Sequence, residues 1–189
     1  MEQLLEAFAA GVREVLAADL VGVYVSGSVV LGDVNPRSSD VDVLVVSENR
    51  PDAATVTRLA ALHRELASRY EWGGRLEGAY TARSQLRPWG IEGPVAAIAP
   101  GRELETVAAA EHGPSNILAL RTVGRVLAGA APGAVFPEVD APTLERGVRG
   151  YVDELACAGV EEGAAGRSLR VLDLARSLYT LAHRRPVSK

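Results

Sequence analysis

The chain has 189 residues, of which 48% are hydrophobic, and a formal net charge of −4. The apolar content is sufficient for a packed core, and the acidic balance argues against a chain-wide basic surface for nucleic acid. It suits a cationic or neutral small substrate better than an anionic polymer. The single cysteine, Cys157, excludes an internal disulfide. No signal peptide or run of roughly 20 apolar residues is recognisable, so we expect a soluble, cytoplasmic protein.

The first hundred residues alternate helical and strand patterns. Apolar residues at helical spacing predict an amphipathic helix over 2–18. The β-branched and aromatic run 20–26 predicts a strand, Gly27-Ser28 begins a turn or short helix, and 40–46 predicts a second strand. The next expected elements are a helix opened by Pro51-Asp52 and ended by Gly73-Gly74, a strand over 75–82 and a strand over 93–99.

The composition changes after about residue 102. Alanine, leucine, glutamate and arginine dominate, good strand runs disappear, and we expect helices over 103–111, 114–129, 142–158 and 165–183. The sequence therefore predicts an α/β (α+β) fold, in which a small mixed sheet flanked by helices over 1–102 precedes an all-helical domain over 103–189. We expect the functional site in the groove between the two parts, because ligand sites are frequent between domains.

Two aspartates stand at the head of the second predicted strand. Side chains on a strand alternate between its faces, so Asp40 and Asp42 point the same way while Val41 and Val43 point the other. Two like charges at this separation repel each other. A divalent cation between them relieves the repulsion, and Mg²⁺ is usually held by one or two carboxylates plus phosphate oxygens.

Gly27-Ser28 and Glu77 complete a candidate site for nucleotide chemistry. Glycine lets a backbone approach a ligand closely, and a serine hydroxyl can bind phosphate oxygens. Glu77 lies within a predicted strand, an unusual place for an acid unless it faces a cleft. There it would be a third metal ligand or the general base that takes a proton from an attacking hydroxyl.

The Gly-Ser pair, the later Asp-x-Asp pair and the acid on a following strand resemble the nucleotidyltransferase superfamily with the DNA polymerase β-like core. More narrowly, the chain is similar to the streptomycin/spectinomycin-type aminoglycoside adenylyltransferases. In "RLEGAYT", Glu77 matches the catalytic-base glutamate, and in "VLDLARSLYTLAHRRPVSK" the matching phosphate contacts are Arg176 and Lys189. The resemblance implies Mg²⁺ as cofactor, ATP as co-substrate and transfer of AMP to an antibiotic hydroxyl.

The helical part departs from the drug-modifying members of that family. The position of one drug-contacting acid falls on Gly166, and the tryptophan position falls on or near Cys157. Glu162 remains as the candidate acid for substrate binding. Nucleotide chemistry therefore transfers better than drug identity, and the expected partner is an aminoglycoside-like small molecule rather than nucleic acid or membrane.

Simpler interpretations stand beside each assignment. Asp40 and Asp42 could be a solvated strand start, Gly27-Ser28 an ordinary turn, and Glu77 a surface acid. Arg176 could be the partner of Asp173, one turn earlier on the same helix. We also expect His63 to be solvated, and Trp72 and Trp89 to cover the edges of the core.

Three functions follow from these patterns. The first is an adenylyltransferase for an aminoglycoside or aminocyclitol. The second is a nucleotidyltransferase with another acceptor, such as a metabolite or a protein side chain. The third is a non-catalytic relative, for example an antitoxin-like or regulatory protein. Resemblance of fold alone does not choose the acceptor.

Overall fold

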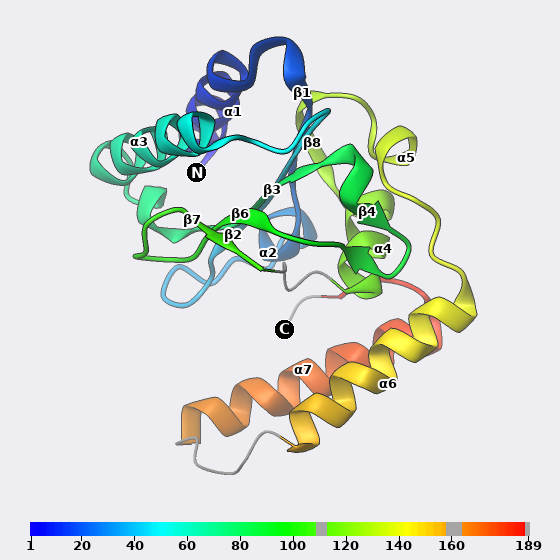
Figure 1. Ribbon diagram of the computed structural model, residues 1–189. Coiled ribbons are helices and arrows are strands. Elements are labelled where there is room, and N and C mark those ends of the chain that lie inside the picture. The colour runs from blue at the N-terminus through cyan, green and yellow to red at the C-terminus, as the bar shows by residue number, and fades with distance from the viewer. Residues whose placement is uncertain (109–112, 158–163, 188–189) are drawn as a thin grey trace.

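The computed structural model describes residues 1–108, 113–157 and 164–187 (Figure 1). The elements in chain order are α1 (Glu2–Leu16), β1 (Leu20–Val25), α2 (Gly27–Leu31), β2 (Val41–Ser47), α3 (Ala53–Arg69), β3 (Leu76–Ala82), β4 (Leu86–Arg87), β5 (Gly90–Ile91), β6 (Val95–Ile98), β7 (Glu105–Val107), α4 (Pro114–Val123), β8 (Arg125–Gly129), α5 (Pro132–Val135), α6 (Ala141–Cys157) and α7 (Ala164–His183).

A six-stranded sheet in the order β7-β6-β3-β2-β1-β8 organises the molecule. Strands β2 and β3 run parallel, and the other neighbours are antiparallel. Parallel strands need a long crossover connection, which α3 supplies here. Asp52 caps the N-terminus of α3, since its Oδ1 accepts a hydrogen bond from the Thr55 amide at 2.8 Å. The crossover places the first residues of β2 beside the first residues of β3.

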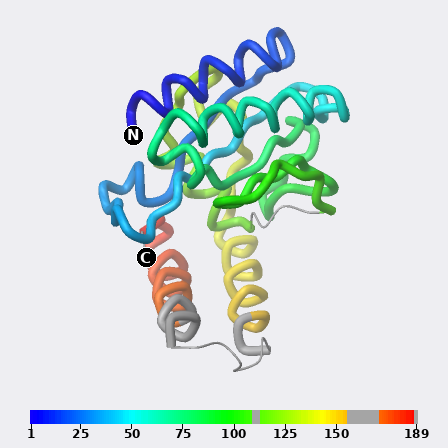
Figure 2. The backbone as a smooth tube through the Cα atoms, turned by 90° about the vertical axis from the view of Figure 1, so that its left-hand side faces the viewer, coloured from blue at the N-terminus to red at the C-terminus, as the bar shows by residue number. Residues whose placement is uncertain are grey.

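One face of the sheet is covered by α1 and α3, which lie side by side above it in both views (Figures 1 and 2). The core on this face joins the apolar stripes of the two helices to alternate strand residues, among them Val23, Val43, Val45, Leu76 and Tyr80. The alternation of buried valines on β1 and β2 follows from the two-residue period of a strand. This face is closed by the N-terminal half of the chain.

The opposite face is covered by α4, α5 and the start of α6. Its core contains Tyr24, Leu44, Val46, Ala79, Ile117, Leu120, Phe136, Leu144 and Val148. The helices α6 and α7 form an antiparallel pair that projects away from the sheet (Figure 2). In the parts of the chain that the structure describes, no helix is both long and apolar enough for a membrane crossing.

The expectation that only helices follow residue 102 was wrong at two places. Residues 105–107 form the edge strand β7, and residues 125–129 form β8, which pairs with β1. Gly124 ends α4 before β8, because its amide bonds back to the carbonyls of Ala119 and Leu120. The run after Gly124 is compatible with a helix by composition, and pairing with the edge of β1 makes it a strand. The helices expected over 142–158 and 165–183 are confirmed as α6 and α7.

Two side-chain environments also differ from expectation. His63 is buried at 5% exposure, so it is not solvated. Trp89 is 55% exposed and donates a hydrogen bond from Nε1 to Glu92, so it does not cover the core. Trp72 packs against the core beside α3, as expected. The division at residue 102 stays a prediction, although β7 and β8 extend the sheet beyond it.

Candidate active site on the α4 face of the sheet

Asp42 and Glu77 are direct neighbours across the parallel pair β2 and β3. Residues in register on adjacent strands, which lie about 4.8 Å apart, project to the same face. Asp42 alternates with Val43 and shares its side with Leu44, just as Glu77 shares its side with Ala79. Both acids therefore lie on the face covered by α4, and α1 and α3 cover the other face.

Asp40 lies immediately before β2, two residues from Asp42, and its position on the same face stays a prediction. Both are partly buried, whereas Glu77 is exposed. No three Asp, Glu, His or Cys side chains form a group that could hold a metal ion within residues 1–108, 113–157 and 164–187. The structure thus brings Asp42 next to Glu77 in register, and the roles of all three acids as metal ligands stay predictions.

Gly27 lies against the carboxylate of Asp42. Its φ is +64°, and a Cβ atom built at this position would collide with Asp42 Oδ2. The amide of Ser26, the residue before, donates to the main-chain carbonyl of Asp42 at 3.0 Å. The turn from β1 into α2 therefore lies beside the start of β2, with Gly27 against Asp42, and the roles of Gly27 and Ser28 in phosphate binding stay predictions.

Glycine is also required next to Glu77. Gly78 has a φ of +155°, and a Cβ there would collide with the carbonyl oxygen of Val43 on the neighbouring strand. A side chain at this position would push β3 away from β2. The close approach of the two strands, and with it the pairing of Asp42 with Glu77, depends on this residue.

Arg176 lies on α7 and forms an ion pair with Asp173, from Nη2 to Oδ1 at 3.1 Å. This confirms the simpler interpretation of that arginine, and phosphate contact remains a prediction. Lys189, the second expected phosphate contact, and Glu162, the expected acceptor contact, lie outside the described residues.

Arg75 is a residue of the site region that the sequence interpretation missed. It ends the short helix η2 (Gly73–Arg75), immediately before β3. Its guanidinium donates from Nη1 to the carbonyl of Pro36 at 2.7 Å and lies 4.6 Å from the ring centre of Trp72. Pro36 belongs to the loop that leads to Asp40. No local sequence signal reveals this contact, because the acceptor is a main-chain carbonyl far away in the chain.

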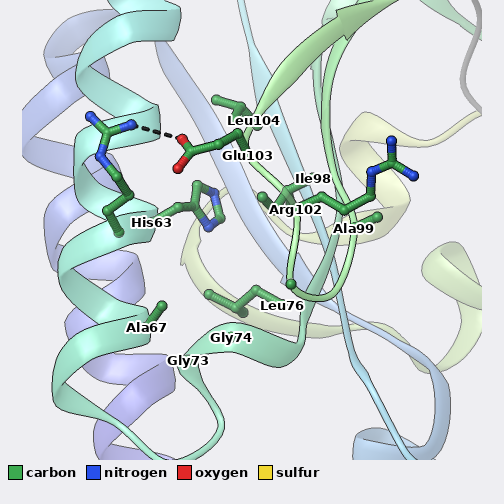
Figure 3. Close-up of a pocket in the computed structure, with 12 residues that line it drawn as sticks. His63, Ala67, Gly73, Gly74, Leu76, Ile98, Ala99, Arg102, Glu103 and Leu104 are labelled. Atoms are coloured by element: carbon green, nitrogen blue, oxygen red, sulfur yellow. Dashed lines mark hydrogen bonds and ion pairs between the residues drawn. The ribbon is translucent and has the colours of Figure 1, made fainter.

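A cavity of about 220 Å³ lies on the other face of the sheet, between α3 and the chain around residues 98–104 (Figure 3). His63 points into it, and Nε2 of this residue is 2.9 Å from the hydroxyl of Tyr80. Arg64 and Glu103 form an ion pair of 2.7 Å beside the cavity. Burial lowers the pKa of His63 to about 4 and raises the pKa of Tyr80. Because α3 lines this cavity, it is separate from Asp42 and Glu77.

Residues 6–78 match the family model described as "Nucleotidyltransferase domain". This part of the chain is similar to nucleotidyltransferase domains. It begins within α1 and ends just after Glu77, so it contains Gly27, Ser28, Asp40 and Asp42. The suspected superfamily is thereby confirmed, and the match supports an enzyme of this type. A search of curated proteins gives no match.

Among solved structures, the fold resembles that of the spectinomycin adenyltransferase AAD(9) from Enterococcus faecialis, whose crystal structure contains ATP and spectinomycin. The TM-score is 0.73 and the sequence identity 16%, with 99% of this chain and 78% of that chain covered. At this identity the likeness concerns the fold. It extends past the nucleotidyltransferase domain to α6 and α7, which the family model does not reach.

Proposed function

We propose that the protein is a Mg²⁺-dependent nucleotidyltransferase that transfers AMP from ATP to a hydroxyl group of an aminoglycoside or aminocyclitol. The observation that carries the proposal is the register pair of Asp42 and Glu77 on one face of the nucleotidyltransferase domain. Nucleotidyl transfer needs carboxylates for two different tasks, binding a cation and accepting a proton. The domain offers acids for both at one end of the β2–β3 pair.

The chemistry of Asp40 and Asp42 fits magnesium. Both supply hard carboxylate oxygens, and no histidine or cysteine that could ligate a softer metal occurs in the sequence segment around them. Two carboxylates plus substrate phosphate oxygens are a usual protein site for Mg²⁺. When bound, the ion would offset the negative charge of the triphosphate during transfer. This donor set requires no third protein ligand, so Glu77 is available as a base.

In the proposed reaction, Glu77 accepts the proton of the acceptor hydroxyl. The hydroxyl oxygen forms a bond to the α-phosphorus of ATP, and the bond from that phosphorus to the bridging oxygen of the β-phosphate breaks. Pyrophosphate leaves with the electron pair. Ser28 would donate a hydrogen bond to a phosphate oxygen, with Gly27 allowing close approach of the chain. Positioning and charge neutralisation are the main sources of rate in such transfers.

The acceptor class and the remaining contacts rest on the resemblance to aminoglycoside adenylyltransferases. The solved structure of similar fold contains spectinomycin, and the net charge of −4 suits a cationic or neutral acceptor. We assign Glu162 to the acceptor and Arg176 and Lys189 to the phosphates. Arg176 would exchange Asp173 for a phosphate oxygen, since its side chain is 38% exposed and so open to the approach of a ligand.

The proposal is tested by ATP-dependent release of pyrophosphate with Mg²⁺ across a panel that includes streptomycin, spectinomycin and other aminoglycosides. Release with any of these compounds, together with adenylylated product by mass spectrometry, is the expected result. Binding of ATP–Mg²⁺ by calorimetry without release would refute the antibiotic as acceptor and favour another acceptor. Absence of nucleotide binding would refute the enzyme itself.

Two isosteric substitutions separate the proposed roles. Asp42→Asn should abolish turnover and Mg²⁺-dependent ATP binding, whereas Glu77→Gln should lower kcat by about 10²–10⁴-fold with little change in ATP affinity. Glu105→Gln, an exposed acid on the edge strand β7, is the matched control and should behave like the unaltered protein. Full turnover in Asp42→Asn would remove the metal role, and an unchanged kcat in Glu77→Gln would move the base elsewhere.

A further inference from the structure

Arg75 connects the two segments of the nucleotidyltransferase domain that carry the candidate acids. It stands two residues before Glu77, and its guanidinium reaches the loop between α2 and β2. Besides the 2.7 Å bond to Pro36, Nη1 lies 3.5 Å from the carbonyl oxygen of Ser39, the residue before Asp40. One side chain at the head of β3 thus contacts main-chain atoms on the approach to β2.

The loop that Arg75 holds is an organised turn. The Asn35 carbonyl accepts from the amides of Ser38 and Ser39, at 3.2 and 2.9 Å, and the Ser39 hydroxyl accepts from the Asn35 amide at 2.9 Å. The Asn35 side chain accepts from the amide of Arg37 at 2.9 Å. These bonds fix the turn internally but do not attach it to the sheet. Arg75 makes that attachment on the side of β3.

Arg75 is itself held in place by Trp72. The guanidinium lies over the indole ring at 4.6 Å, and Trp72 packs against the core formed by α1 and α3. Stacking on an aromatic face and donating in the plane to carbonyls are compatible for a planar guanidinium, and a lysine cannot do both in the same way. The stacked side chain of Arg75 therefore links the turn to the core through Trp72.

We propose that Arg75 is a positioning residue that sets the place of Asp40 relative to Glu77, and thereby the geometry in which a divalent cation and a nucleotide are bound. The proposal rests on the proposed function for the identity of the ligand. Arg75 touches neither reactant; it acts through the main chain at Pro36 and Ser39. Groups that orient metal ligands typically change metal affinity by about 10–100-fold when they are removed.

The first test measures the turn without any ligand. In Arg75→Met, amide hydrogen exchange over residues 33–40 should become faster while exchange in α1 and α3 stays the same. Arg69→Met is the matched control, because Arg69 likewise lies near an aromatic ring, Tyr70, and donates to a polar partner, Glu65, yet lies on α3 away from the turn. Unchanged exchange over residues 33–40 in Arg75→Met would overturn the proposal.

The second test measures coupling to Asp40. The Mg²⁺ concentration for half-maximal ATP binding should rise about 10–100-fold in Arg75→Met and less in Arg75→Lys, which keeps one donor. In the background of Asp40→Asn, Arg75→Met should add no further change, because both substitutions then remove the same contribution. Equal effects of Arg75→Met in both backgrounds would overturn the positioning role. If the unaltered protein binds no ATP with Mg²⁺, the proposed function fails, and the exchange experiment decides separately on Arg75 as the attachment of the turn.

Discussion

Lowering the pH from about 7 to about 5 should destabilise the protein through the buried imidazole of His63. This side chain is 5% exposed, contacts the ring of Phe8 at a centroid distance of 5.7 Å, and pairs with the Tyr80 hydroxyl at 2.9 Å. Burial lowers its pKa from 6.5 to about 4. Between these values the unfolded chain binds a proton at His63 and the folded protein does not, so the free energy of unfolding decreases as the pH falls.

The size of the effect follows from the two pKa values. A difference of about 2.5 units corresponds to about 3.4 kcal/mol when the pH is well below both values. Over the interval from pH 7 to pH 5, the contribution of His63 is about 2 kcal/mol, because the folded protein has then only begun to protonate. Well above the unfolded-state pKa of 6.5 the contribution is constant, since neither state then carries the proton.

Urea unfolding at several pH values measures this contribution as a difference between variants. His63→Gln keeps a partner for the Tyr80 hydroxyl but does not titrate, so its stability should fall by about 2 kcal/mol less between pH 7 and 5 than that of the unaltered protein. The control variant is His183→Gln, which removes an exposed imidazole on α7 and leaves the buried pair of His63 and Tyr80 in place. Parallel pH profiles for the unaltered protein and His63→Gln would refute the reasoning.

Two further predictions concern the sheet. Gly27→Ala should reduce stability by about 1–2 kcal/mol because of its positive φ, and should also weaken Mg²⁺-dependent ATP binding, because the new methyl group displaces the Asp42 carboxylate. The control is Gly32→Ala, at φ +74° with no atom within 4 Å, which should cost similar stability in urea unfolding but keep ATP binding. Equal ATP binding by the two variants would contradict the collision argument. Tyr24→Phe removes the 2.9 Å hydrogen bond to the carbonyl of Ala130 and should lower the free energy of unfolding by about 1 kcal/mol, measured in the same way, whereas an unchanged midpoint would show that this carbonyl finds another donor.

The central strands and their acids could be predicted because their signals are local. The valine-rich runs of β1 and β2 have the composition of buried strands, and an acid within the next strand, at Glu77, is unusual enough to suggest a cleft. The parallel register that pairs Glu77 with Asp42 could not be predicted from either run alone, because it depends on how α3 crosses the sheet. The sequence pattern identified the acidic residues, but only the crossover through α3 brings them next to each other.

The errors have equally physical causes. The segment that forms β8 has no strand pattern of its own, and its conformation is decided by the edge of β1, which is remote in sequence. His63 stands beside the charged Arg64, which suggested solvent, but it falls on the same helical face as Leu59 and Leu66, both buried. Helical spacing was the better guide than the neighbouring charge. Arg75 was missed because main-chain acceptors leave no mark in a sequence.

The strand order has a consequence for how the protein is made. Both edge strands of the large sheet, β7 and β8, come from residues 105–129, while its four inner strands come from residues 20–98. A nascent polypeptide that has emerged only through β3, at residue 82, therefore presents β1 and β3 with unpaired edges to other nascent chains. The second edge of β1 stays unpaired until β8 has been translated. Pausing or premature termination before residue 125 would therefore yield an aggregation-prone product.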